Sequence, residues 1–258
     1  MPRFAANLSM LFTEHAFLDR FRAAADAGFT AVECQFPYAH PPHAVARALA
    51  DADQTMVLHN LPPGDWSRGE RGLAAVPGRE AEFRQAVEAG IRYAQALGCR
   101  QVNCLSGVAE GPAARACLIE NLKYTADALG EAGIRCLTEP INPIDMPGFL
   151  LTGMEQGAEI VREIASPNLF LQYDLYHRQR MVGGLLEAFE RFRPLIAHIQ
   201  LADAPGRHEP GTGEIDFACV LRALDDKGYA GYVGLEYVPQ RGTLEGLGWL
   251  KTLGFGNS

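Results

Sequence analysis

The sequence predicts an α/β protein folded as a (β/α)8 barrel, in which eight parallel strands are each followed by a helix. Three observations favour this class. Short β-prone runs alternate with longer helical segments, and the alternation can be counted to eight. The length of 258 residues suits one domain over residues 1–258, and 48% hydrophobic residues can fill a continuous core. Finally, a polar residue ends each of the last four runs.

The expected strands are short apolar runs separated by amphipathic segments. They cover residues 4–9, 31–36, 56–61, 101–106, 135–140, 169–174, 196–201 and 232–237. Two helical segments show the periodicity clearly, with apolar residues at helical spacing at Phe17, Leu18, Phe21 and Ala25, and at Phe83, Val87, Ile91 and Ala94. Because right-handed crossovers connect successive strands, all eight strands should be parallel.

Glycine marks the end of several expected helices. Gly28, Gly98, Gly133 and Gly228 each follow a periodic helical segment and stand one to three residues before an apolar run. A left-handed C-cap at these glycines would let the chain turn into the next strand. A doubly wound open sheet is the competing fold, but no GxGxxG follows the first run, so a nucleotide-binding version has little support.

The charge of the chain bears on its partners. A formal charge of −8 argues against nucleic acid, because nucleic-acid binding uses clustered Lys and Arg to neutralise phosphates. A small molecule is therefore the expected partner. The lysines Lys123, Lys227 and Lys251 all fall in expected helical segments, so a Schiff-base lysine at a strand end is not expected. Homo-oligomerisation stays open.

The cysteines and the hydropathy pattern bear on location. The six cysteines form no CxxC pair, which is typical of reduced core thiols in a cytosolic protein. The N-terminal MPRFAANLSMLF lacks the pattern of a cleaved signal, and no segment approaches the ~20 apolar residues of a membrane span. We expect a cytoplasmic protein that does not enter a membrane.

Four polar residues stand at the carboxyl ends of expected strands five to eight, namely Glu139, Asp174, Gln200 and Glu236. Active sites of this fold lie at that end of the barrel, and adjacent strands are ~4.8 Å apart. Three carboxylates converging there would repel one another unless a cation lay among them. Oxygen ligands select a hard divalent ion, so we predict a metal site for Mg²⁺ or Mn²⁺.

The same carboxylates suit proton transfer at carbon. Glu139 and Glu236 could face each other across a bound substrate, one removing a proton and the other returning it. A divalent ion on adjacent carbonyl and hydroxyl oxygens would acidify the neighbouring C–H bond and stabilise the resulting enediolate. For a single exposed carboxylate, strand capping or an arginine partner would be the ordinary role. Four such groups at equivalent positions favour the metal site.

Substrate contacts are predicted next to these residues. His177 follows Asp174 by three residues and could hold a substrate oxygen, while Arg207 could bind a substrate carboxylate. His59 is a weaker candidate, open to the alternative of a core histidine, and His198 could orient Gln200. Three further residues at strand ends are ranked only as pocket lining: Asn7, Glu33 and Asn103.

The longest expected connection runs from about Pro62 to Gly78. Loops of this length in a compact domain are often functional. Trp66, Arg68 and Arg71 could close over the mouth of the barrel and exclude water from a reactive intermediate. The alternative is a solvated excursion with one tryptophan held at the surface.

Motifs along nearly the whole chain resemble the hydroxypyruvate isomerase family, a branch of the xylose isomerase-like barrels that also includes 2-oxo-tetronate isomerases and, more distantly, ketose 3-epimerases and endonuclease IV. The matching stretches, in the family's order, are FAANLSMLF, LHNLPPGDWSRGERGLAAVPGRE, QVNCLSG, TEPINPIDMPGFLLT, LQYDLYH, HIQLADAPGRHEPGTGEIDF and GLEY. The resemblance implies a divalent ion held by Glu139, Asp174, Gln200 and Glu236, with Glu139 and Glu236 as the proton donor and acceptor. In the related epimerases a histidine usually replaces Gln200.

The resemblance implies interconversion of hydroxypyruvate and 2-hydroxy-3-oxopropanoate (tartronate semialdehyde) by an aldose-ketose isomerase. The alternatives are 2-oxo-tetronate isomerisation, epimerisation of a small ketose, a metal-dependent hydrolase and a barrel that binds sugar acids without catalysis. Endonuclease chemistry is not expected, because it uses a histidine-rich multi-zinc cluster and a basic DNA-binding face, and this acidic chain has 7 histidines.

Overall fold

Eight parallel strands pair in the order of the chain and close into a barrel, with the first strand against the last. The structure is a computed structural model that describes residues 2–255. The strands are β1 Arg3–Asn7, β2 Ala31–Cys34, β3 Thr55–Asn60, β4 Gln101–Cys104, β5 Arg135–Thr138, β6 Leu169–Asp174, β7 Ile196–Leu201 and β8 Tyr232–Leu235. The predicted (β/α)8 barrel is confirmed, and the open doubly wound sheet is wrong.

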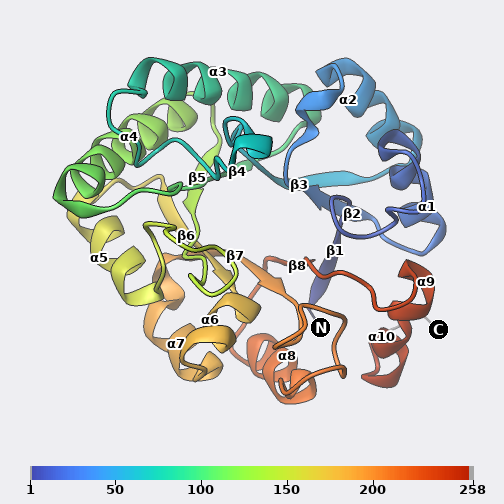
Figure 1. Cartoon of the computed structure of the whole chain (residues 1–258). Helices are drawn as coiled ribbons and strands as arrows, with labels where there is room; N and C mark the ends of the chain where they lie inside the picture. The colour runs from blue at the N-terminus through green and yellow to red at the C-terminus, as the bar shows by residue number, and fades with distance from the viewer. Residues whose placement is uncertain (1, 256–258) are drawn as a thin grey trace.

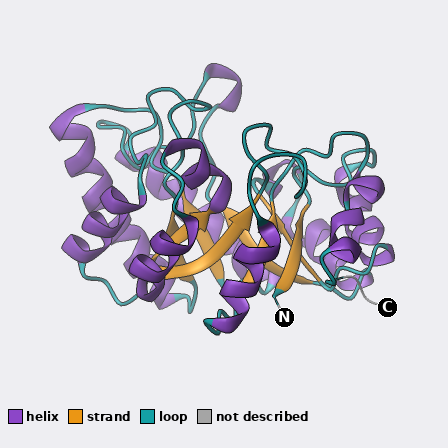
Figure 2. Cartoon of the chain, turned by 90° about the horizontal axis from the view of Figure 1, so that it is seen from below, coloured by secondary structure: helices purple, strands orange, loops and turns teal. Residues whose placement is uncertain are grey.

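Helices surround the barrel in a ring (Figure 1). They are α1 Arg20–Asp26, α2 Pro42–Asp51, α3 Glu80–Leu97, α4 Gly111–Glu131, α5 Met154–Ile164, α6 Leu175–Met181, α7 Leu185–Phe192, α8 Phe217–Asp226, α9 Thr243–Gly246 and α10 Gly248–Thr252, with 3-10 turns η1 Phe17–Asp19, η2 Pro37–Ala39, η3 Trp66–Arg68 and η4 Arg193–Leu195. Seen from the side, the longer loops gather at one end of the strands (Figure 2). That end is where the strands finish, so these loops frame the site.

The expected helix faces and glycine turns are present. Phe83, Val87 and Ala94 of α3 are buried against the barrel, as their spacing predicts. Gly98 directly caps α3 with φ of 62°, in the left-handed region that glycine enters without a steric penalty. Gly28, Gly133 and Gly228 follow their helices with positive φ as well. These turns return the chain to the amino end of the next strand.

Five strands end two residues earlier than expected, and Glu139 and Glu236 are therefore the first residues beyond β5 and β8. The chain leaves the sheet there to form the rim loops, although the backbone N–H of Glu236 still donates to the Leu201 carbonyl at 3.1 Å. Both side chains still lie at the rim, since they continue the alternation that points Leu137 and Gly234 inward.

The upper part of the barrel interior is polar. Glu33 on β2 is fully buried, and its carboxylate accepts hydrogen bonds from Asn7 Nδ2 at 2.9 Å, Gln200 Nε2 at 2.7 Å and His198 Nε2 at 2.7 Å. Gly234 on β8 makes the room for it, because a Cβ there would lie 2.3 Å from the carboxylate oxygens. The burial of this acid is compensated by three donors from two other strands, β1 and β7.

Below this polar layer the barrel is closed by small and aliphatic residues. Ala5, Ala31, Val57, Leu58 and Leu137 form a separate apolar cluster inside the strands. The main hydrophobic core lies outside the strands, between barrel and helices. Together they fix the height of the polar layer along the barrel axis.

His59 lies on the outer face of β3. Its neighbours Leu58 and Asn60 pair in register with Glu33 and Asn103, whose side chains face the interior, so His59 must point outward. The placement speaks against the expected substrate contact. The run MVLHNL does not show which of its side chains face the barrel interior. A bulge in the pairing of β2 with β3 shifts the register, and this shift decides it.

The His59 ring belongs to the packing between barrel and helices. Tyr38 donates its hydroxyl proton to the Asn60 carbonyl at 2.6 Å, and His59 Nδ1 lies 3.2 Å from the same hydroxyl. The ring packs edge-on to Tyr38, which in turn contacts Tyr93 of α3. Burial lowers the pKa of His59 to about 4.

The six cysteines are free thiols, and four of them are buried. Within residues 2–255, none of the helices combines the length and the hydropathy needed to cross a bilayer.

The His59 environment predicts a pH-dependent loss of stability. Because the folded state holds this imidazole neutral and the unfolded chain protonates it near 6.5, the free energy of unfolding should fall as pH drops from 6.5 toward 4, by about 3 kcal/mol. A His59→Gln variant has no imidazole at this position, so its free energy of unfolding should not show this pH-dependent loss. Urea unfolding at pH 7.0 and 4.5 should show the wild type losing about 2 to 3 kcal/mol more than the variant. Parallel losses in both proteins would contradict the buried neutral imidazole.

Candidate active site

Glu139 begins the loop after β5 and is buried at the carboxyl rim. Its Oε2 accepts a hydrogen bond from Asn103 Nδ2 at 3.0 Å, while its Oε1 has no hydrogen-bond partner among the described residues. Burial, followed by the nearby carboxylates of Glu236 and Asp174, raises the pKa of Glu139 well above its usual range. Burial and neighbouring negative charge therefore both favour the protonated form of Glu139 over the carboxylate.

Asp174 ends β6 and also caps α6. Its Oδ1 accepts from the backbone N–H of Tyr176 at 2.7 Å and of His177 at 3.4 Å, which satisfies orphan donors of the first helical turn. Its Oδ2 is buried and accepts no hydrogen bond from the part of the chain that the structure describes. Burial raises the pKa of Asp174 to about 7, although the positive charge of Arg207 opposes the shift.

His177 stands one turn into α6, with its Nε2 at 3.6 Å from Asp174 Oδ2 and 3.9 Å from Glu139 Oε1. The three side chains form a group whose ligand atoms all lie within 4.8 Å of one another. Burial, together with the charge of Arg207, lowers the pKa of His177 well below its usual range. The imidazole is therefore neutral beside two acids.

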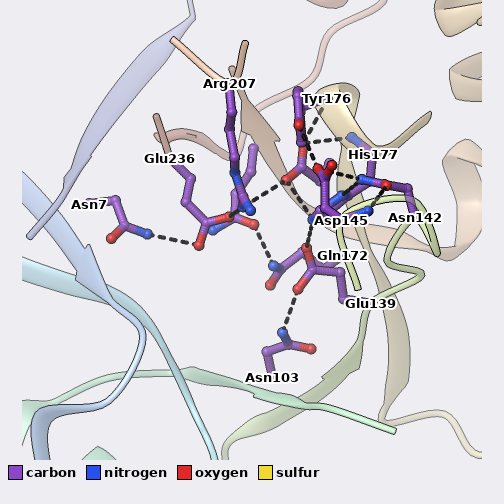
Figure 3. A network of polar contacts seen from close by, with 12 residues as sticks. Asn7, Asn103, Glu139, Asn142, Asp145, Gln172, Tyr176, His177, Arg207 and Glu236 are labelled. Carbon is purple, nitrogen blue, oxygen red and sulfur yellow. Dashed lines mark hydrogen bonds and ion pairs between the residues drawn. The ribbon is translucent and has the colours of Figure 1, made fainter. Parts of the chain in front are cut away.

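Glu236 begins the loop after β8 and is surrounded by donors. Its carboxylate accepts from Arg207 at 2.6 Å, from Gln35 Nε2 at 2.9 Å and from Asn7 Nδ2 at 3.2 Å. Figure 3 shows Glu139 and Glu236 pointing into the same space, with Arg207 reaching in from its loop. The two glutamates thus meet at one site although they lie on strands separated by β6 and β7.

Arg207 is the cation of the cluster. Its guanidinium lies 5.1 Å from the centre of the Tyr176 ring and 3.9 Å from Asp174 Oδ2, besides its bond to Glu236. Burial alone would lower the pKa of Arg207, but the carboxylates of Glu236, Asp174 and Glu139 raise it above its ordinary value. Within residues 2–255 its buried Nε–H has no hydrogen-bond partner, so this donor can bind a ligand.

The loop between β7 and α8 holds Arg207 in place. Asp203 is buried, and its carboxylate accepts from five backbone N–H groups, those of Ala204, Gly211, Thr212, Gly213 and Ile215. The backbone of Arg207 donates to the Asp203 carbonyl at 2.8 Å and has φ of 57°, which costs a residue with a side chain about 1 kcal/mol or more. The loop is folded around Asp203. Its contacts hold Arg207 in a strained backbone conformation from which the guanidinium reaches Glu236.

Gln200 on β7 pairs in register with Asp174 on β6 and contacts the polar side chains of the barrel interior. Its Nε2 donates to Glu33 at 2.7 Å and its Oε1 accepts from Gln172 Nε2 at 2.5 Å. Since an amide oxygen has two lone pairs, the bond from Gln172 leaves one for a further contact. His198, expected to orient Gln200, contacts Glu33 instead and acts on Gln200 only through that carboxylate.

The donor set fits a hard cation. Glu139 Oε1 and Asp174 Oδ2 are buried carboxylate oxygens without hydrogen bonds, and both face the same gap as His177 Nε2. A positive ion between them would relieve their mutual repulsion and the cost of burying them. The structure therefore has a group of side chains that can hold a divalent metal ion.

The predicted lid residues lie in the loop between β3 and α3. Trp66 is 44% exposed, packs on Phe36 with ring centres 5.4 Å apart, and has the Arg71 guanidinium 3.8 Å from its ring. Phe36 follows Gln35, which binds Glu236, so Trp66 lies near the mouth of the barrel. Arg68 is exposed on the same turn, where Asp65 caps its backbone N–H.

Several residues of the site carried no signal in the sequence or only a weak one. Asn7, Glu33 and Asn103 were expected only as pocket lining, yet each holds a site residue by a direct hydrogen bond. The sequence predicts no role for six further residues of the site or its supports: Gln35, Asn142, Asp145, Gln172, Tyr176 and Asp203. Gln172 could have been predicted, because it lies two residues before Asp174 on β6 and so faces the barrel interior on the same side of the strand.

A closed (β/α)8 barrel with buried acids, a neutral histidine and one arginine at its carboxyl rim is the framework of an enzyme that handles a small, oxygen-rich substrate. The chain belongs to the xylose isomerase-like TIM barrel family, whose model matches residues 21–253.

Relatives extend the comparison to nearly the full length. The chain is 47% identical to a hydroxypyruvate isomerase of Escherichia coli, covering 97% of this chain and 98% of the relative. It is 46% identical to a 2-oxo-tetronate isomerase of Cupriavidus necator, with coverages of 97% and 98%. A solved structure described as AP endonuclease, family 2, from Brucella melitensis superposes with a TM-score of 0.95 at 45% identity, covering 98% and 99% of the two chains.

The cation site can be tested by thermal stability. A divalent ion that binds only the folded state raises the unfolding free energy by about 2.7 kcal/mol at 100 times its Kd, so Mn²⁺ should raise the melting temperature of the wild type. A Glu139→Gln variant keeps the volume but lacks the charged ligand, and it should lose most of this shift. Glu88→Gln, an exposed change of the same charge on α3, is the matched control and should keep it. Equal shifts in all three proteins would rule out Glu139 as a ligand.

Proposed function

We propose that this protein is a hydroxypyruvate isomerase, an intramolecular oxidoreductase that interconverts hydroxypyruvate and 2-hydroxy-3-oxopropanoate. The observation that carries the proposal is the meeting of Glu139 and Glu236 in one buried site, with Arg207 and His177 beside them. The 47% identity to an isomerase of that name supports the choice of substrate. Isomerisation of this kind needs two proton carriers and donors for two oxygens, and the site contains both.

Glu139, Asp174, Gln200 and Glu236 are the residues that would hold a divalent ion, with Mg²⁺ the first choice and Mn²⁺ the second. All four offer oxygen, which suits these hard cations. When bound, the ion would supply positive charge that acidifies the C–H bond beside the carbonyl and stabilises the negative charge of the enediolate. The unpartnered oxygens of Glu139 and Asp174 support this assignment.

The surroundings of the two glutamates favour different roles. Glu236 accepts hydrogen bonds from an arginine and two amides, which suits a carboxylate that removes the proton from C3 of hydroxypyruvate. Glu139 lies against other carboxylates with a raised pKa, which suits an acid that delivers a proton to C2. The hydroxyl proton of O3 passes to O2 in the same conversion, so atoms and charge balance. Reversal of the reaction exchanges the two roles.

The substrate carboxylate needs a positive partner. Arg207 supplies it through its buried Nε–H, which has no partner among residues 2–255, and through the edge of the guanidinium that now contacts Glu236. His177 would donate to one of the reacting oxygens. Trp66 and Arg68 would cover the mouth, and the packing of Trp66 on Phe36 supports that position.

A 2-oxo-tetronate isomerase is the second candidate, supported by the 46% identity to the relative with that name. The same residues would perform the same proton transfers on a substrate one carbon longer. One carbon changes binding by only ~1 to 3 kcal/mol, so residue chemistry alone does not separate the two substrates. Epimerisation of a small ketose would use the same pair of glutamates, with proton removal and return at one carbon.

Endonuclease chemistry is not supported, although the superposed Brucella structure carries that description. A chain of charge −8 does not favour binding to phosphate backbones. Among the described residues, the cluster at the rim combines Glu139 and Asp174 with a single histidine, His177. A barrel that binds sugar acids without catalysis would have no use for a proton carrier like Glu139. The free cysteines support a reducing compartment, and we place the protein in the cytoplasm on that ground.

The role of Glu236 is tested by Glu236→Gln, which keeps the shape of the side chain but cannot accept a proton. We expect kcat on hydroxypyruvate to fall by about 10²- to 10⁴-fold, the usual contribution of a general base, while substrate affinity by calorimetry changes little. Glu131→Gln, an exposed change on α4, is the matched control and should keep full activity. Unchanged turnover in Glu236→Gln would exclude the glutamate as proton carrier, and binding without any turnover in the wild type would favour the non-catalytic barrel.

Substrate length and proton exchange can be measured in one assay. We expect kcat/KM for the three-carbon substrate hydroxypyruvate to exceed that for 2-oxo-tetronate by about tenfold or more, within the range that one carbon provides. Turnover in heavy water should place deuterium at C2 of the product, because the returning proton comes from an exchangeable carboxyl group. Preference for the four-carbon substrate would instead identify a 2-oxo-tetronate isomerase.

A further inference from the structure

The ring of His177 lies between an amide on one side and two acids on the other. Its Nδ1 is 2.7 Å from Asn142 Nδ2, and its Nε2 faces Asp174 Oδ2 and Glu139 Oε1 at 3.6 and 3.9 Å. The ligand atoms of His177, Glu139 and Asp174 are close enough to share a metal ion. Whether His177 is a ligand or a hydrogen-bond donor depends on which nitrogen carries its proton.

The orientation of the Asn142 amide decides this question. Its Oδ1 accepts from the backbone N–H of Asp145 at 2.9 Å, and its Nδ2 donates to Asp145 Oδ2 at 3.1 Å. A flipped amide would set its NH2 against that N–H and its oxygen against that carboxylate, so both contacts would become repulsive. The NH2 group must therefore face His177.

An amide NH2 can only donate, so His177 Nδ1 must be the acceptor, which needs a lone pair there. The neutral imidazole then carries its single proton on Nε2, the nitrogen that faces Asp174 and Glu139. A histidine that ligates through Nε2 needs the lone pair on that atom, and protonation removes it. In this arrangement neither ring nitrogen can bind a cation.

We propose that Asn142 is a positioning residue that fixes His177 as the Nε2–H tautomer, so that His177 donates a hydrogen bond to a substrate oxygen and is not a ligand of the cation held by Glu139 and Asp174. The part that concerns the substrate rests on the proposed function. The tautomer itself follows from hydrogen bonding alone.

The loop that carries Asn142 is fastened to the helix that carries His177. Tyr176 donates its hydroxyl to Asp145 Oδ2 at 2.5 Å, and Arg180 lies 3.6 Å from the other oxygen of the same carboxylate. Both belong to α6, as His177 does, and Figure 3 shows Tyr176 and Asp145 beside His177. Asp145 thus ties the loop after β5 to α6 and keeps Asn142 within hydrogen-bond reach of His177 Nδ1.

Exchange of the amide and the carboxylate tests the proposal without a change of net charge. In the double variant Asn142→Asp/Asp145→Asn, a carboxylate faces His177 Nδ1 and can only accept, so the ring proton should move to Nδ1. Asp145→Asn alone keeps Asn142 and is the matched control, in which the proton should stay on Nε2. NMR of ¹⁵N-histidine-labelled protein reports the tautomer, with the His177 signals among the 7 histidines identified by their absence in His177→Gln.

The wild type should show the Nε2–H tautomer both without metal and after addition of Mg²⁺. A wild-type Nδ1–H tautomer, loss of the Nε2 proton on addition of Mg²⁺, or an unchanged tautomer in the double variant would each overturn the proposal. Near- and far-UV circular dichroism should match between the double variant and the Asp145→Asn control. If the double variant misfolds, Asn142→Ser replaces it. The serine hydroxyl can donate to His177 Nδ1 and should preserve the Nε2–H tautomer.

Turnover then tests the part that concerns the substrate. We expect kcat of the double variant to fall about 10- to 100-fold relative to Asp145→Asn, as for other residues that orient a functional histidine. A switched tautomer with unchanged kcat would overturn the donor role of His177. Absence of hydroxypyruvate turnover in the wild type would refute the proposed function instead, while the NMR result on the tautomer would stand by itself.

Discussion

The carboxylates of Glu139, Asp174 and Glu236 are buried within one site, and their mutual repulsion is the constraint around which the rim is built. Burial of a charge without compensation costs several kcal/mol, so each acid must be neutralised, paired or bound to a cation. Glu236 is paired with Arg207, whereas Glu139 and Asp174 each keep one oxygen free. The pair that remains uncompensated is where a positive ion or a proton is needed, and either one serves the chemistry of an isomerase.

The support for these acids comes from inside the barrel and from two rim loops. Asn7 on β1 donates to both Glu33 and Glu236, and Asn103 on β4 donates to Glu139. The barrel interior thus contributes hydrogen-bond donors to two of the acids. From above, the loop folded on Asp203 delivers Arg207. The loop tied through Asp145 delivers Asn142 to the same site. An apolar layer lies beneath the polar one, and side chains from seven of the eight strands or their carboxyl ends meet above it.

The arrangement separates binding from proton transfer. Arg207 and the neutral imidazole of His177 are donors and can hold oxygens, while the two glutamates differ in their partners and can exchange a proton with carbon. Under the proposed function, the same division would suit hydroxypyruvate, its four-carbon analogue and small ketoses. This shared use of the site is consistent with the different substrates named for relatives of similar identity.

The sequence by itself determined the barrel, because alternation of strand and helix periods is a local property and eight units are enough to close a sheet. It also located Glu139, Asp174, Gln200 and Glu236, since residues at the carboxyl ends of parallel strands meet at one rim. Only the tertiary structure decided that His59 faces the helices, because a bulge shifts the register of β3. It alone brought Asn142 to His177 and Arg207 to Glu236, since the positions of loop residues are set by contacts such as those of Asp145 and Asp203, which no periodicity encodes.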